Sequence, residues 1–165
     1  MVSQLFLGGA RSGKSRLAQQ AAEACPGALT LIATAEPLDA EMAARIARHQ
    51  ADRGPRWTLI EAPLALPQAL AAAPGVVLVD CLTLWLSNVM LAGQDVAAAE
   101  AALCGAIAAR HDPLFLVSNE VGLGLVPETP LGRAFRDAQG RLNQAVAATV
   151  DRVDFVASGL ALRLK

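Results

Sequence analysis

The stretch Gly8-Gly9-Ala10-Arg11-Ser12-Gly13-Lys14-Ser15 decides how this chain folds and what it can bind. It fits the pattern G-x-x-x-x-G-K-[ST] at every position. The glycines allow a tight turn in which successive backbone N–H groups face one anion, and the following helix adds its positive N-terminus. Lys14 can reach the β- and γ-phosphates of a nucleotide, and the Ser15 hydroxyl can bind Mg²⁺. The pattern therefore predicts a phosphate-binding loop (P-loop) of these eight residues, with Lys14 taking part in catalysis.

The residues on either side of this loop have the pattern that such a loop requires. An apolar run over residues 4–7 predicts a strand directly before it, and a helical pattern over residues 14–24 follows directly. The chain has only two lysines, Lys14 and Lys165. Lys14 stands at the position where binding of nucleotide phosphates needs a cation on a flexible side chain. A glycine-rich turn without a ligand is the alternative interpretation, which this context disfavours.

The rest of the chain alternates short apolar runs with longer helical patterns. Runs that predict strands cover residues 29–33, 57–60, 76–79, 114–117 and 153–156, and a last short run covers 160–164. Helical patterns cover residues 39–53, 64–73, 82–91, 96–110 and 131–150. Such alternation indicates a parallel sheet covered on both faces. We therefore expect an α/β protein with a P-loop NTPase-like three-layer fold, a mostly parallel central sheet and a single domain over residues 1–165.

Asp80 directly follows the apolar, β-branched run at residues 76–79. An acid at the carboxyl end of a buried strand stands where open α/β sheets place their ligands. Many buried strands end in Asp without such a role, but the P-loop favours a contact with metal or nucleotide. We therefore expect Ser15 and Asp80 to be the protein ligands of Mg²⁺.

His49 lies on the helix expected over residues 39–53, four residues after Arg45 and four before Arg53. Three basic groups can therefore share one side of this helix. A neutral imidazole beside cations can meet a nucleotide phosphate and attack phosphorus. An exposed histidine on an amphipathic helix is the alternative, and the spacing does not decide between them. The other histidine, His111, is interpreted as a solvated cation at the end of a helix.

The composition excludes several classes of protein. With 165 residues, 54% of them hydrophobic, and a formal net charge of −1, the chain is too apolar for disorder and lacks the basic surplus of nucleic-acid binders. Prolines interrupt its longest uncharged stretch, residues 62–79, which argues against a membrane span. Cys25, Cys81 and Cys104 are far apart and predict buried thiols. No signal peptide is visible, so we expect a cytoplasmic protein without a nucleic-acid partner.

Further motifs follow through the rest of the chain. They are LIATA (31–35), DAEMAARIARH (39–49), WTLIE (57–61), DCLTLWLSN (80–88), VSNEVGLGLVP (117–127), LGRAFRDAQGRLNQ (131–144) and ASG (157–159). Together with the P-loop, and in this order, they resemble the family of bifunctional adenosylcobinamide kinases / adenosylcobinamide-phosphate guanylyltransferases of cobalamin biosynthesis. Two positions depart from the family pattern. Leu31 stands where an aromatic residue is frequent, and Arg48 stands where some members have a second histidine.

The resemblance implies two reactions. The family phosphorylates the aminopropanol hydroxyl of adenosylcobinamide with ATP or GTP. It then transfers GMP from GTP to that phosphate through a guanylylated histidine, which releases pyrophosphate and gives adenosylcobinamide-GDP. The motif R-I-x-x-H assigns this nucleophile to His49. Beyond the P-loop, the implied nucleotide-binding residues are Ala33, Thr34, Ala35, Gln50, Ala51, Asp52, Arg53, Glu61 and Asp80.

The resemblance also implies the partners of the protein. They are GTP, or ATP for the kinase reaction, together with Mg²⁺ and a corrinoid substrate. Family members form homo-oligomers, and we expect one here, with a trimer as one form. During guanylyl transfer the P-loop would hold the leaving pyrophosphate while neutral His49 attacks the α-phosphorus, with Arg45 or Arg53 available to hold anionic oxygens.

Several assignments stay open at this point. Asn119 and Glu120 follow an expected strand, and they either serve the substrate side of the site or form an ordinary polar loop. Arg133, Arg136 and Arg141 recur at helical spacings, where they could face a phosphate, a subunit neighbour or solvent. A monofunctional small-molecule kinase is one alternative function. A GTPase-like regulator is another, but its N-K-x-D motif is missing from a chain with lysine only at 14 and 165.

Overall fold

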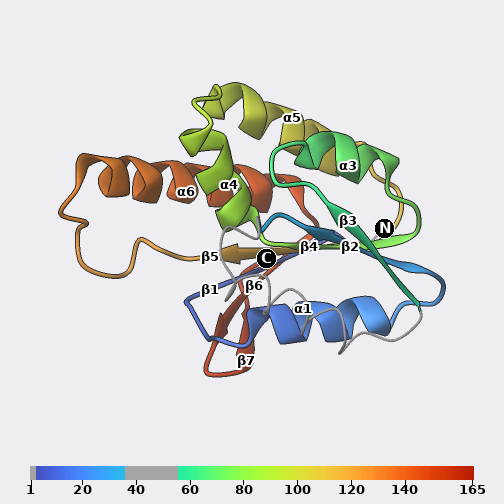
Figure 1. Cartoon of the computed structure of the whole chain (residues 1–165). Helices are drawn as coiled ribbons and strands as arrows, with labels where there is room; N and C mark the ends of the chain where they lie inside the picture. The colour runs from blue at the N-terminus through green and yellow to red at the C-terminus, as the bar shows by residue number, and fades with distance from the viewer. Residues whose placement is uncertain (1–2, 36–55) are drawn as a thin grey trace, which may run out of the picture.

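Seven strands form one sheet in the computed structural model, which describes residues 3–35 and 56–165 (Figure 1). Their order across the sheet is β3-β2-β4-β5-β1-β6-β7. The first six strands of this order run parallel, and β7 pairs antiparallel with β6 at the edge. The bounds are β1 Ser3–Gly8, β2 Leu29–Ala33, β3 Trp57–Glu61, β4 Val76–Asp80, β5 Leu114–Asn119, β6 Arg152–Ala157 and β7 Leu160–Arg163.

Helices cover both faces of this sheet, so the predicted three-layer α/β fold is confirmed. Of the helices in the described ranges, α1 (Lys14–Glu23) lies on one face and four lie on the other (Figure 1). These four are α3 Leu66–Ala72, α4 Leu82–Leu91, α5 Val96–Ala108 and α6 Pro130–Thr149. In the two described ranges, no helix is both long enough and apolar enough to cross a membrane.

The alternation of side chains along the central strands divides the core into two layers. Leu5 and Leu116 belong to the larger apolar cluster, which packs against α3, α4, α5 and α6. Phe6 and Val117, their neighbours in sequence, belong to the cluster that contains Ala18 of α1. Ala18 is completely buried, so its small side chain allows α1 to lie close to the sheet. Both faces of the central strands are therefore buried, which explains why their sequences are continuous apolar runs.

The observed elements differ from the predicted ones mainly at their ends. Strands β1, β4 and β5 continue to Gly8, Asp80 and Asn119, because backbone pairing extends past the last apolar side chain. The run at 160–164 forms β7, which pairs with β6 through a turn at Ser158 and Gly159, where φ is 52° and 78°. The helix predicted over residues 39–53 lies outside the described residues.

Gly8 ends β1 at the point where the chain turns away from the sheet. A Cβ atom at this position would lie 2.3 Å from the carbonyl oxygen of Val156 on β6 and 2.9 Å from Ser12 Oγ. The first contact is with backbone, which cannot move aside without disturbing the pairing of β1 with β6. At Gly9, by contrast, a Cβ atom would meet no heavy atom of the described residues within 4 Å. The two adjacent glycines therefore differ in how much space surrounds them.

This difference predicts different stabilities for two single substitutions. Gly8→Ala should lower the free energy of unfolding by about 1–3 kcal/mol, the usual cost of overpacking a tight site. Gly9→Ala should change it by less than about 0.5 kcal/mol, as at other open surface positions. Urea unfolding followed by circular dichroism measures both values. Equal midpoints for the two variants would show that the close approach at Gly8 is relieved at no cost.

Candidate active site

The three central strands β4, β5 and β1 bring their carboxyl ends to one edge of the sheet. Gly8 of β1 pairs in register with Asn119 of β5, and Asp80 of β4 pairs with Val117 of β5. Val117 packs in the cluster under α1, and residues paired in a parallel ladder share a face, so Asp80 and Asn119 lie on the α1 side. The P-loop leaves β1 at the same edge and leads into α1. Residues from three strands therefore surround the loop.

The P-loop has the backbone geometry of an anion-binding turn. Arg11 and Gly13 have positive φ values of 58° and 94°, and Gly13 is the N-cap of α1. Lys14 is only 8% exposed, and its Nζ donates a hydrogen bond to the Gly9 carbonyl at 3.0 Å. The Ser12 hydroxyl is buried and finds no hydrogen-bond partner within the described part of the chain. A cation and a hydroxyl donor therefore face the interior of the loop, where a phosphate could accept from both.

The turn between β6 and β7 supports the P-loop from the side. The Gly159 N–H donates to the Ser12 carbonyl at 2.8 Å. A Cβ atom at Gly13 would lie 3.2 Å from Gly159 Cα, so the two backbones are in close contact. The ASG motif at residues 157–159 thus has a structural reason, which the sequence alone did not show. A glycine at 159 supplies the positive φ and the small size that the contact needs.

Thr34, one of the predicted nucleotide-binding residues, joins the ends of β2 and β4. Its Oγ1 donates to the Cys81 carbonyl at 2.7 Å and accepts from the Cys81 N–H at 3.0 Å. Asn88 Nδ2 donates to the Thr34 carbonyl at 2.8 Å. Thr34 is fully buried and its hydroxyl is engaged within the protein. Its clearest role is therefore to fix this part of the edge, and Ala33 and Ala35 lie on either side of it.

Glu61 lies farther from the P-loop than the other described candidates. It ends β3, is exposed, and pairs in register with Ala33 of β2. In the strand order, β5, β4 and β2 stand between β3 and β1. At about 4.8 Å per strand, Glu61 is on the order of 19 Å from the start of the P-loop. It can therefore contact only a part of a nucleotide that is remote from the phosphates held in the loop.

Burial and neighbouring acidic groups act in opposite directions on the pKa of Lys14. Burial lowers the pKa of the Lys14 ammonium, while Cys81 and Asp80 oppose this shift. Burial also raises the pKa of the Cys81 thiol, and the neighbouring Asp80 adds to that increase. The ammonium is thus partly desolvated, with carboxylate charge nearby. A bound phosphate would favour the charged form of Lys14 and so oppose the effect of burial on its pKa.

Asn119 and Glu120, which the sequence left unassigned, are held beside the P-loop. The Glu120 N–H donates to the Gly8 carbonyl at 3.0 Å, and the Asn119 N–H donates to Thr83 Oγ1 of α4 at 2.8 Å. From α6, Asn143 Nδ2 donates to the Asn119 carbonyl at 3.1 Å. The end of β5 is therefore attached to the loop and to two helices.

A network of buried polar side chains joins β5 to α6 next to these contacts. Ser118 Oγ donates to Asn143 Oδ1 at 2.6 Å, and Gln139 Nε2 donates to both groups at 3.0 and 2.9 Å. Gln139 and Asn143 are 0% and 5% exposed on an otherwise apolar helix face. Their i, i+4 spacing among apolar neighbours is the signal that sequence reasoning could have used. Polar side chains facing a core need partners, and here the partners are on β5.

The arginine series on α6 has mostly local contacts. Arg133 Nη1 donates to the Pro127 and Glu128 carbonyls at 3.0 and 2.8 Å, which fixes the segment before the helix. Arg136 pairs with the adjacent Asp137 at 3.2 Å. Arg141 is exposed. These contacts give Arg133 a structural role at the start of α6.

The residues at this edge fit a magnesium ion bound together with a nucleotide. Ser15 and Asp80 offer a hydroxyl and a carboxylate, which are the oxygen ligands that Mg²⁺ prefers. In residues 3–35 and 56–165, no group of three or more His, Cys, Asp or Glu side chains could hold a metal. Mg²⁺ usually takes one or two protein ligands and completes its shell with phosphate and water. The donor set therefore suits a metal that arrives with a substrate phosphate.

Five predicted site residues lie outside the described part of the chain. They are His49, Gln50, Ala51, Asp52 and Arg53. Their roles remain predictions from the sequence. All the other predicted residues lie along the carboxyl edge of the sheet or in the P-loop that leaves it.

Comparison with known proteins gives consistent matches over almost the whole chain. A family model described as cobinamide kinase / cobinamide phosphate guanyltransferase matches residues 4–164. The bifunctional adenosylcobalamin biosynthesis protein CobP of Pseudomonas aeruginosa is 46% identical, over 98% of this chain and 96% of that protein. The proteins named CobU of Salmonella typhimurium and Escherichia coli are 41% and 38% identical, each over 98% of both chains.

The lowered pKa of Lys14 predicts a pH effect on phosphate binding. The affinity for a nucleoside triphosphate should fall as the pH rises toward the pKa of Lys14, because the loop then loses its cation. Binding at alkaline pH should take up a proton, since bound phosphates stabilise the ammonium. Calorimetry in two buffers with different ionisation enthalpies measures this uptake.

The control for this prediction is Lys14→Met, which should bind more weakly and take up no proton through this group. Whereas the affinity for the nucleotide should fall as the pH rises, the free energy of unfolding of the unliganded wild-type protein should rise. The folded state holds fewer protons than the unfolded state between the two pKa values, so stability rises with pH in that window. Binding of the wild-type protein without proton uptake at any alkaline pH would contradict the prediction.

Proposed function

The chain belongs to the cobinamide kinase / cobinamide phosphate guanyltransferase family, and from this premise we propose that one nucleotide site serves two transfer reactions. The first moves the γ-phosphoryl group of ATP or GTP to the aminopropanol hydroxyl of adenosylcobinamide. The second moves GMP from GTP to the new phosphate and releases pyrophosphate. The observation that carries the proposal is the P-loop at the carboxyl edge, in a chain that matches the family over residues 4–164.

In the kinase reaction, the chain positions the phosphates and stabilises charge. The loop N–H groups and Lys14 hold the β- and γ-phosphates, and the acceptor hydroxyl approaches the γ-phosphorus in line with the leaving oxygen. Negative charge that develops on the leaving group is met by Lys14, whose position is fixed by burial and by the Gly9 carbonyl. Mg²⁺, held by Ser15 and Asp80, would neutralise phosphate charge when bound.

The guanylyl reaction needs a nucleophile at the α-phosphorus. We assign it to His49, which lies in the motif R-I-x-x-H. The neutral imidazole forms a bond to the α-phosphorus, and the bond to the bridging oxygen of pyrophosphate breaks. The phosphate of the corrinoid then displaces the histidine from the GMP group. The P-loop holds the leaving pyrophosphate with the same contacts that hold the β- and γ-phosphates in the first reaction.

The position of the other histidine supports this assignment. His111 is exposed and lies between α5 and β5, at the amino end of the strand. The P-loop lies at the carboxyl end of the same sheet. β5 has six residues, so at about 3.3 Å per residue the two ends are on the order of 20 Å apart. His111 therefore cannot reach a nucleotide held in the P-loop.

The strand order supports an orientation for the nucleotide. With the phosphates at β1, the rest of the nucleotide would extend across the ends of β4 and β2 toward Glu61 on β3. Ala33, Thr34 and Ala35 lie on this path, and Glu61 would meet the nucleoside end. We further propose that the protein is cytoplasmic and a homo-oligomer, with a trimer as one form, as the resemblance to the family implies.

GTP labelled at the α-phosphate tests the covalent step. Incubation without corrinoid should leave label on the wild-type protein that is stable to base and labile to acid, as a phosphoramidate is. His49→Ala should carry less than about 1% of that label, because the nucleophile is gone. His111→Ala is the matched control and should be labelled like the wild type. Label that survives in His49→Ala would overturn the assignment of the nucleophile.

The same variants separate the two reactions. His49→Ala should still transfer the γ-phosphoryl group to cobinamide, because that reaction needs no protein nucleophile. Loss of both transfers in a folded His49→Ala protein would contradict a role confined to guanylylation. Thin-layer separation of the corrinoid products measures both activities.

A further inference from the structure

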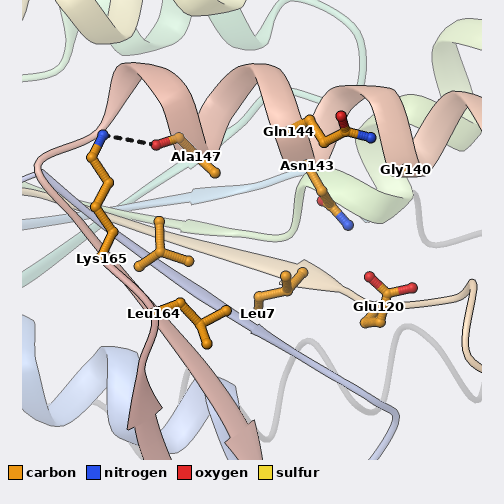
Figure 2. Close-up of a pocket in the computed structure, with 9 residues that line it drawn as sticks. Leu7, Glu120, Gly140, Asn143, Gln144, Ala147, Leu164 and Lys165 are labelled. Atoms are coloured by element: carbon orange, nitrogen blue, oxygen red, sulfur yellow. Dashed lines mark hydrogen bonds between the residues drawn. The ribbon is translucent and has the colours of Figure 1, made fainter.

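A groove runs between α6 and strands β1 and β6 on the face of the sheet opposite α1 (Figure 2). It has a volume of about 380 Å³, at the small end of the roughly 300–1,000 Å³ of ligand pockets. Its floor includes Leu7, Val153 and Leu164, and its α6 wall includes Gly140, Gln144 and Ala147. We call it the α6 groove. Among the described residues, neither the P-loop nor any residue predicted to bind nucleotide lines it.

One end of the α6 groove lies just past the end of β5, next to the residue at which the P-loop begins. Glu120 lines that end (Figure 2), and its N–H donates to the carbonyl of Gly8, the first residue of the loop. The carboxylate of Glu120 also accepts from the Gly122 N–H at 2.5 Å, which limits where it can point. A molecule lying in the groove would therefore present its end beside the backbone at which the P-loop begins.

The charges along the groove disfavour an anion. At the end far from the P-loop, the Lys165 ammonium donates to the carbonyls of Ala147, Ala148 and Val150 at the C-terminus of α6. Its charge is thereby used to cap the helix. At the other end stands the Glu120 carboxylate. The walls between them are apolar, apart from amides such as Gln144. Such a groove suits a neutral chain with methylene, amide and hydroxyl groups.

We propose that the α6 groove binds the aminopropanol arm of the cobinamide substrate, with the arm's terminal hydroxyl at Glu120. The inference rests on the proposed function. The arm is a slender chain of methylenes and a methyl group, interrupted by an amide, and it ends in the hydroxyl that receives phosphate. Leu7, Val153 and Leu164 would contact its apolar parts, while Gln144 is available for its amide. The corrin ring, which is too bulky for this volume, would remain outside.

The Glu120 carboxylate at the open end affects the arm differently before and after it is phosphorylated. Before phosphorylation, Glu120 accepts a hydrogen bond from the neutral hydroxyl. After phosphorylation, the arm ends in an anion, and repulsion by Glu120 weakens its hold at this position. The arm must then withdraw or turn before guanylyl transfer. Glu120 therefore favours the unphosphorylated arm.

Gly140 offers a direct test, because it lines the groove and has room for a side chain. A Cβ atom there would meet no heavy atom of residues 3–35 or 56–165 within 4 Å. Gly140→Leu should fill the groove without disturbing the fold, and replacing a helical glycine favours the helix by up to about 1 kcal/mol. We expect KM for cobinamide to rise at least tenfold in the kinase reaction. The Kd for GTP and the α-phosphate labelling with GTP alone should stay within twofold of wild type.

Gly105 of α5 provides the matched control. It is also helical and has the same open surroundings, but it lies away from the groove. Gly105→Leu should leave KM for cobinamide unchanged. Gly140→Ala, a smaller change at the same position, should raise KM less than Gly140→Leu and guards against a folding defect in the larger variant. Unchanged KM in both Gly140 variants would overturn the proposal.

Two further results separate the competing explanations. A changed assembly mass for Gly140→Leu in light scattering would overturn the proposal, since a second copy of the chain would then occupy the groove. A wild-type protein that labels with GTP but never phosphorylates cobinamide would overturn the kinase part of the proposed function, and this inference with it.

Glu120→Gln tests the charge at the open end. Removing the carboxylate charge should lower KM for cobinamide phosphate severalfold in the guanylyl reaction, because the repulsion is gone. The same change should raise KM for unphosphorylated cobinamide, since the acceptor of the hydroxyl is weaker. A merely structural role for Glu120 would move both values in the same direction, and that outcome would contradict the placement of the hydroxyl.

Discussion

The close approach of β1 and β6 at Gly8 is the constraint on which the site depends. A Cβ atom at residue 8 would lie 2.3 Å from the Val156 carbonyl oxygen, so the P-loop can leave the sheet here only without a side chain. The Gly8 carbonyl then accepts the Glu120 N–H, which joins the start of the loop to the end of β5. One residue thus lets the loop turn and ties it to the neighbouring strand.

Small polar contacts from distant parts of the sequence hold the rest of the edge in place. Gly159 donates to the carbonyl of Ser12, and Thr34 bridges to Cys81 through its hydroxyl. From α6, Asn143 donates to the carbonyl of Asn119. Each of these hydrogen bonds holds a segment of the backbone in place and does not itself present a side chain to a ligand. The loop can therefore keep Lys14 buried and its phosphate donors aligned before a nucleotide arrives, which reduces the reorganisation that catalysis would need.

Local patterns in the sequence were enough to predict the six parallel strands, the described helices and the P-loop, because these depend on residues close in the chain. They did not predict which strands are neighbours, so the remote position of Glu61 on β3 emerged only from the strand order. The hydrogen bonds of Ser118 with Gln139 and Asn143 join residues more than 20 positions apart, so no helical or strand periodicity could predict them. The resemblance to a family pointed to residues 157–159, but only the structure shows that their turn supports the P-loop.

The end of β5 lies between the P-loop side of the sheet and the α6 groove. Asn119 lies on the α1 face with Asp80, where the P-loop leads into its helix, whereas Ser118 bonds to α6 and Glu120 lines the α6 groove. Asn119, the last residue of β5, thus lies on the face of α1, while Ser118 and Glu120 on either side of it face α6 and its groove. If the acceptor arm lies in the groove, its hydroxyl reaches the phosphates only past Glu120. The alternation of side chains along β5 and into Glu120 would then keep donor and acceptor apart except at the atoms that react.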